Sequence, residues 1–188
     1  MEAAVNKKKH SLFLWYTLFF AVAAVLCFSY FAIYQKSFLW KNDGLYQHYN
    51  AFLYVGKQIR SFIRGVISDG NFSFPMWEWG FGGGADVISN QILYDPFYLL
   101  SVFFPTRFAE FGYGFTVVLR LYLVGFTFCL YCRKMDCAKW TTVFASIAYT
   151  FCAFSLYAGP RHPYFLNAMY VIPLIFLGCE KIFRKESF

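Results

Sequence analysis

Four long stretches of the chain carry almost no charged residue, and this pattern constrains the fold more than any other feature. They cover residues 11–34, 111–132, 140–158 and 164–183. A bilayer core about 30 Å thick is crossed by roughly 20 apolar residues in a helix, so each stretch is long enough, or nearly so, to span a membrane. The first is too long for a signal-peptide core and is followed by no clear cleavage site. The sequence therefore predicts an all-α polytopic membrane protein with four transmembrane helices.

Composition and charge agree with this class. Of the residues, 59% are hydrophobic, 24% aromatic and only 14% charged, and the mean hydropathy is +0.44, unlike an ordinary soluble domain. The net charge of +7 is better explained by basic residues that flank membrane spans than by nucleic-acid binding. These residues gather at the N-terminus, between the second and third spans, and at the C-terminal end: Lys7, Lys8, Lys9, Arg133, Lys134, Lys139, Lys181, Arg184 and Lys185. The positive-inside rule then predicts that both termini are cytoplasmic and that residues 35–110 are external.

The external segment contains an amphipathic pattern followed by a short apolar stretch. Apolar residues recur at three- and four-residue spacing between residues 45 and 66, which predicts a helix, and Lys57, Arg60 and Arg64 share its other face. Such a helix is expected to lie along the outer membrane surface, near anionic headgroups or the phosphate of a lipid-linked substrate; plain surface anchoring is the alternative. Residues 97–104 lie between two prolines and are too few to cross. They predict a short interfacial or re-entrant helix whose ends are covered by protein.

Between these two helices lies a stretch rich in tryptophan and glycine, residues 75–86. It is predicted to have neither helix nor strand. Glycines allow a close approach of the backbone to a ligand, and the faces of Trp77 and Trp79 can stack on sugar rings or pack at the membrane interface. The segment can be a structural loop or a contact to a ligand, and the sequence leaves both interpretations open.

A few polar residues stand out as candidates for chemistry. Asp43 lies just beyond the outer end of the first span, where a carboxylate can meet a lipid headgroup without being buried unpaired. Arg161 and His162 share the outer loop between the third and fourth spans and are candidates for binding a lipid phosphate. Arg120 lies within the second span and is expected to face the bundle or an outer cavity, with Asp95 as a structural partner in the alternative interpretation.

Several function classes lack support. The chain contains no Ser/His/Asp set, no His-Glu-x-x-His motif and no dinucleotide fingerprint, which argues against hydrolases, zinc proteases and dehydrogenases. The six cysteines fall in predicted spans or the inner turn, where small apolar packing is expected instead of disulfides. One external carboxylate loop without a dense acidic cluster offers few oxygen ligands, so no cofactor is predicted, and a divalent metal stays an open alternative without support.

The order of several short motifs resembles the beginning of the YfhO family of bacterial membrane proteins. The resemblance runs through nearly all 188 residues. It is carried, in order, by Asn42-Asp43-Gly44 with Gln47, the glycine-rich residues 80–86, Tyr94-Asp95-Pro96-Phe97-Tyr98-Leu99-Leu100, Phe103-Phe104-Pro105, His162-Pro163 and Pro173-Leu174. Members of this family are several times longer. The resemblance therefore implies that residues 1–188 form a single transmembrane region, the N-terminal portion of a longer protein.

The resemblance implies a glycosyltransferase of the GT-C architecture in the bacterial plasma membrane. The expected donor is a polyprenyl-phosphate-linked sugar and the expected acceptor a cell-envelope glycopolymer such as lipoteichoic acid, on the outer face. Asp43 is the catalytic carboxylate that the resemblance implies, with Gln47 and Asp95 as further motif positions. Arg120, Arg161 and His162 are expected to steady the phosphate, and Trp77 and Trp79 to border the acceptor. The alternatives are a transporter or flippase for lipid-linked sugars and an inactive membrane fragment or scaffold.

Overall fold

The structure, a computed structural model, describes residues 2–186, with only the backbone for residues 2–10 and 91, so the side chains of Lys7, Lys8 and Lys9 lie outside it. The regular elements of the described chain are helices apart from one pair of two-residue strands, which confirms the predicted all-α class. It divides into two compact units. Unit 1 comprises Met1–Lys36 and Val117–Phe188, and unit 2 comprises Ser37–Thr116.

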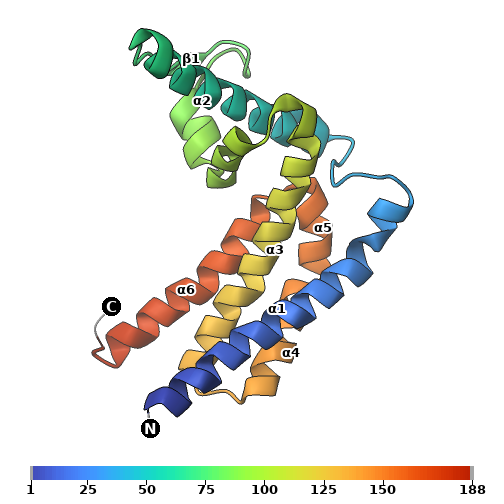
Figure 1. The fold of residues 1–188 in the computed structure, drawn as a ribbon, viewed down its shortest axis with the longest axis vertical. Coiled ribbons are helices and arrows are strands. Elements are labelled where there is room, and N and C mark those ends of the chain that lie inside the picture. The colour runs from blue at the N-terminus through green and yellow to red at the C-terminus, as the bar shows by residue number, and fades with distance from the viewer. Residues whose placement is uncertain (1, 187–188) are drawn as a thin grey trace. The chain divides into compact units, whose positions relative to one another are not determined.

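Unit 1 holds the apolar helices that form the candidate membrane spans (Figure 1). They are α1 (Glu2–Ile33), the larger part of α3 (Ala109–Lys134), α4 (Lys139–Thr150), α5 (Ala153–Arg161) and α6 (Phe165–Phe183). Three helices in the described chain are long and apolar enough to cross a membrane, and the bent pair of α4 and α5 makes a fourth if it is counted as one span. The predicted polytopic membrane class is thereby confirmed.

The third predicted span, residues 140–158, is not one continuous helix as the sequence predicted. It breaks between α4 and α5, whose axes differ by 45°. The Thr150 hydroxyl donates to the carbonyl oxygen of Ser146 at 2.8 Å, a bond from a side chain to its own helix that favours bending. Cys152 then adopts an extended backbone conformation before α5 begins. Hydropathy did not reveal this break because the stretch is uniformly apolar.

Close packing within unit 1 depends on small residues, as is usual between membrane helices. A Cβ atom at Gly125 of α3 would clash with Tyr16 of α1 and with Thr150 of α4. The Tyr16 hydroxyl also donates to the carbonyl oxygen of Tyr122 at 2.7 Å. All six cysteines are free thiols, and Cys129 is fully buried.

Unit 2 contains the predicted amphipathic helix and a set of short elements. A single turn of π-helix, η1 (Gly44–Tyr49), leads into α2 (Asn50–Asp69), and α2 ends where Gly70 takes a left-handed conformation at φ 63°. The strands β1 (Trp77–Glu78) and β2 (Ala85–Asp86) pair antiparallel. They are followed by the π-helix η2 (Ile88–Leu93) and by the 3₁₀ helices η3 (Pro96–Phe103) and η4 (Thr106–Phe108).

Two details of unit 2 differ from the sequence predictions. The tryptophan- and glycine-rich stretch was predicted to be irregular, whereas its ends form the β1–β2 pair. Left-handed glycines at Gly82, Gly83 and Gly84 let the chain reverse between the strands. The start of the amphipathic helix is π-helical, a widening by one residue that the apolar periodicity does not disclose.

The predicted short helix at residues 97–104 is confirmed as η3, and the protein covers both of its ends. The carboxylate of Asp95 accepts the backbone N–H of Phe97 at 3.3 Å at the start. At the other end, the guanidinium of Arg60 donates to the carbonyl oxygens of Ser101 at 2.6 Å and Phe104 at 3.0 Å. A Cβ atom at Gly56 of α2 would lie 2.7 Å from the Ser101 hydroxyl, so α2 and η3 are in direct contact. Arg60, predicted to face lipid headgroups, is thus engaged inside the protein.

Candidate functional site

Asp43 and Gln47 are held together at the start of the amphipathic helix. Asp43 occupies the position before η1 but makes no side-chain capping bond to it. Instead, the Gln47 side-chain amide donates to Asp43 Oδ1 at 3.1 Å. The Asp43 side chain is partly exposed. The structure therefore brings together two of the residues predicted from the sequence and leaves their carboxylate accessible.

Next to this pair lies a cavity of about 510 Å³ within unit 2. This volume is in the range of small-molecule sites. Its wall is mostly aromatic and amide in character and includes no Lys, Arg, Asp or Glu among the described residues. The lining residues are Tyr46, Gln47, His48, Ala51, Gly80, Phe81, Gly82, Ala85, Asn90, Tyr94 and Tyr98. Because Gln47 both lines the cavity and holds Asp43, the carboxylate lies one hydrogen bond from it.

A buried polar pair forms part of the cavity wall. His48 Nδ1 lies 3.2 Å from the Tyr98 hydroxyl, and the two residues are 5% and 3% exposed. They come from η1 and η3, which are far apart in the sequence. Sequence reasoning did not select either as a site residue, because a lone histidine on an amphipathic helix gives no signal of its partner. The signal that was present is the short spacing between Asp43 and His48.

The loop between β1 and β2 supplies another part of the wall. Gly80, Phe81 and Gly82 line the cavity, and the Phe81 ring packs edge-on against Tyr54 with centroids 4.9 Å apart. Burial, together with the nearby Glu78 carboxylate, raises the pKa of Tyr54 to about 12. This tyrosine therefore stays neutral at physiological pH and acts as a structural support for the loop.

The two predicted tryptophans lie on the same loop but outside the cavity lining. Their rings pack against each other with centroids 5.7 Å apart, and Trp77 is 51% and Trp79 75% exposed. Gly84 permits this arrangement, since a Cβ there would come within 3.0 Å of both rings. The exposed indole faces are available to a ligand or to lipid.

Two carboxylates, Asp95 and Asp86, accept backbone N–H groups at the starts of η3 and η2, the helices that carry cavity residues. Asp95, 1% exposed, caps η3, on which Tyr98 lies. Asp86 Oδ1 accepts the backbone N–H of Ser89 at 2.6 Å, and this bond lowers the pKa of Asp86. It holds the start of η2, which carries Asn90. Asp95, a motif position that the resemblance implies, thus helps to position the cavity wall.

The predicted cations belong to unit 1. Arg120 of α3 is 1% exposed, and its Nε donates to Asn167 Oδ1 at 3.3 Å, in the first turn of α6. Arg161 donates to the Tyr157 hydroxyl and lies over its ring at 3.9 Å. His162 ends α5, with its ring 5.1 Å from that of Phe165. A buried guanidinium bonded to an amide is consistent with the expectation that Arg120 faces the bundle interior.

A metal site needs several ligand side chains close together. Within the described part of the chain, no three His, Cys, Asp or Glu side chains lie together in a way that could hold a metal ion. The cavity beside Asp43 is lined by one histidine and by amide, phenol and backbone groups. Its donor set suits hydrogen bonding to a neutral polar ligand.

Comparison with known proteins adds one finding to this geometry. The family described as bacterial membrane protein YfhO matches residues 17–188. No curated protein and no solved structure matches the chain significantly. The family match covers α1 from residue 17 onward, all later helices, the Asp43–Gln47 pair and the whole cavity. The chain therefore belongs to the YfhO family of bacterial membrane proteins.

Proposed function

We propose that this protein acts in a glycosyltransferase reaction in the bacterial membrane. It would transfer a sugar from a polyprenyl-phosphate donor to a cell-envelope glycopolymer such as lipoteichoic acid, on the outer face. The observation that carries the proposal is the accessible Asp43 carboxylate, held by Gln47 beside a cavity free of charged residues among its described lining. Such a cavity suits an uncharged polyhydroxyl ring, because aromatic faces pack on its C–H surface and amides bond its hydroxyls.

Asp43 is the proposed general base. It would take the proton from an acceptor hydroxyl as the oxygen attacks the anomeric carbon and the bond to the lipid phosphate breaks. Gln47 orients the carboxylate through its amide. One carboxylate is sufficient for an inverting displacement, which needs no covalent sugar intermediate. Arg161 and His162 are the proposed partners of the departing phosphate, and Trp77 and Trp79 those of the acceptor. Arg120, which is buried and bonded to Asn167, would act on the phosphate only through its long-range positive charge.

The first prediction tests the base. Asp43→Asn keeps the size of the side chain and its contact with Gln47 but removes the proton acceptor. Sugar transfer from polyprenyl-phosphate sugars to membrane glycopolymer is expected to fall by about 10²- to 10⁴-fold, the usual contribution of a general base. The amount of protein in the membrane should not change.

Asp69→Asn is the matched control, because Asp69 is an exposed carboxylate at the end of α2. It should retain transfer. Wild-type transfer by Asp43→Asn would remove this residue from the mechanism and the proposal with it.

A second candidate function is transport or flipping of lipid-linked sugars, and the bent α4–α5 pair favours it. Interrupted helices are typical of transporters. Vesicles containing the purified protein and a fluorescent polyprenyl-phosphate sugar distinguish the two. A flippase moves the lipid between leaflets with no acceptor present, whereas a glycosyltransferase consumes it only when acceptor is supplied. An inactive scaffold would do neither.

A further inference from the structure

A second cavity, of about 450 Å³, lies in unit 1 where two candidate membrane spans end. It is formed by the last turns of α3 and α6 and the turn that follows α3. Its lining comprises four cations, one carboxylate and two leucines: Leu130, Arg133, Lys134, Asp136, Leu177, Lys181 and Arg184. Unlike the cavity beside Asp43, it is dominated by positive charge.

The lining has two layers along the helix axes. Leu130 and Lys134 are four residues apart on α3, and Leu177 and Lys181 are four residues apart on α6. In a helix this spacing places both members of each pair on one face, a turn apart. The leucines therefore lie toward the interior of the spans and the lysines toward their ends. An amphiphile with an anionic head and an apolar tail matches this order.

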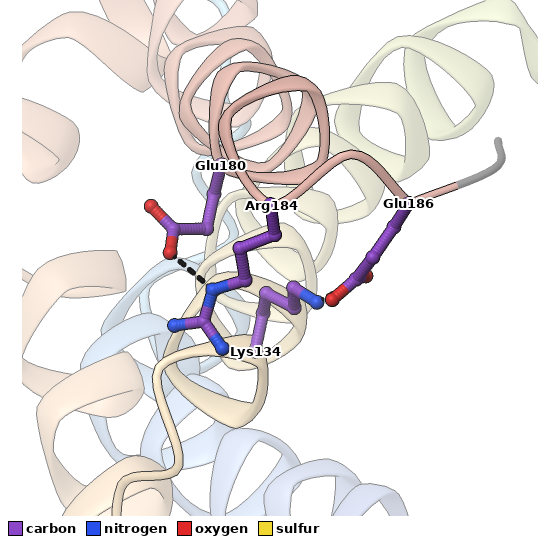
Figure 2. A network of polar contacts seen from close by, with 4 residues as sticks. All are labelled: Lys134, Glu180, Arg184 and Glu186. Atoms are coloured by element: carbon purple, nitrogen blue, oxygen red, sulfur yellow. Dashed lines mark hydrogen bonds and ion pairs between the residues drawn. The ribbon is translucent and has the colours of Figure 1, made fainter.

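Glutamates from the same region hold two of the cations in place (Figure 2). Arg184 Nε donates to Glu180 Oε1 at 2.5 Å, and Lys134 pairs with Glu186. Figure 2 shows the side chain of Lys134, at the end of α3, next to Glu186, and that of Arg184, just past the end of α6, next to Glu180. Counting these glutamates with Asp136, four cations face three carboxylates, which leaves an excess of one positive charge.

We propose that this cavity binds the headgroup of an anionic phospholipid of the surrounding membrane. The phosphodiester, with its single negative charge, balances the excess charge of the cavity, and the start of the acyl chains lies along Leu130 and Leu177. Basic pockets between transmembrane helices are typical sites for anionic headgroups. The leucine layer favours a lipid over free phosphate, because inorganic phosphate gains nothing from apolar surface. This site is independent of the proposed sugar transfer.

The test compares lipid retention by the full protein in nanodiscs that contain phosphatidylglycerol and phosphatidylcholine. The double variant Arg133→Gln/Lys181→Gln removes two cations and leaves both glutamate pairs intact. Each basic residue near an anionic headgroup contributes about a five-fold gain in binding, so phosphatidylglycerol retained in native mass spectrometry should fall by about 10- to 30-fold. Lys36→Gln/Lys185→Gln is the matched control, since both residues are exposed and lie outside the cavity lining; it should retain the lipid.

The variant Arg133→Lys/Lys181→Arg changes the shape of both side chains but keeps their charge. It should retain phosphatidylglycerol, and its folding shows whether the two positions tolerate substitution. If the glutamine double variant does not fold, Lys181→Gln alone should lose about five-fold. Equal retention by the glutamine and control variants would overturn the proposal. The proposal would also be overturned if the protein retained phosphatidylcholine as well as phosphatidylglycerol. The same holds if it bound inorganic phosphate with the same dependence on the variants but did not discriminate between the lipids.

Discussion

At the scale of single residues, the carboxylate and the histidine of η1 have different surroundings. Asp43 is partly exposed and held by an amide, which suits a group that exchanges protons with a ligand. His48 is buried and lies against the Tyr98 hydroxyl, which suits a group that shapes the cavity wall. The sequence pointed to Asp43 because it lies just beyond the first span, and to Gln47 only through the resemblance to the YfhO family. It could not identify the His48–Tyr98 pair, since nothing local links the two positions.

Tyr98→Phe is predicted to weaken the cavity wall without removing the base. The phenylalanine retains the ring but loses the hydroxyl that lies beside His48, and loss of one buried hydrogen bond costs about 1–3 kcal/mol. We expect a lower melting temperature in detergent and a raised KM for the donor, with kcat less affected. Tyr34→Phe, an exposed position in unit 1, is the control. A melting temperature and KM equal to those of the control would show that the pair has no role in the wall.

At the scale of elements, η3 illustrates how a helix too short to span is stabilised. Its apolar sequence and its two flanking prolines were sufficient to predict its existence. Its stability depends on two residues of α2. Arg60 donates to the last carbonyls of η3, and Gly56, which has no side chain, leaves room for Ser101. A short helix leaves its terminal carbonyls without helical partners, and a guanidinium with several donors can satisfy more than one of them.

Arg60→Met is therefore predicted to destabilise unit 2. The methionine retains an apolar stem but leaves the carbonyls of Ser101 and Phe104 without their charged donor, at a cost of about 1.5–3 kcal/mol. A lower thermal unfolding midpoint of the purified protein in detergent is the measurement. Arg64→Met, an exposed position on the same helix, should shift the midpoint much less. Equal shifts for the two variants would contradict the capping role.

At the scale of the whole molecule, the distribution of basic residues predicts the orientation in the membrane. The turn after α3 and the C-terminal end of α6 are basic, whereas most acidic residues lie between residues 35 and 110. The positive-inside rule then places both termini in the cytoplasm. This orientation is what would expose Asp43 to donors and acceptors on the outer face.

Cysteine labelling tests this orientation. The native Cys137 lies exposed in the turn between α3 and α4 and should be protected in intact cells from a membrane-impermeant maleimide. Cys introduced at Asp69, at the exposed end of α2, should react in the same cells. After permeabilisation both should react. Labelling of Cys137 but not of position 69 in intact cells would reverse the topology and remove Asp43 from the outer face.

The sequence by itself determined the membrane class, the number of apolar stretches, the amphipathic helix and the short helix between prolines. Each of these depends on local hydropathy, periodicity or proline placement, and all three are properties of short stretches of the sequence. Only the tertiary structure decided the break between α4 and α5, the π-helical start of the amphipathic helix, the cavity with its buried His48–Tyr98 pair, and the basic cavity between α3 and α6. The two cavities arise from contacts between residues distant in the chain. The helix break and the π-helical turn are local backbone conformations, but neither hydropathy nor apolar periodicity distinguishes them from a regular helix.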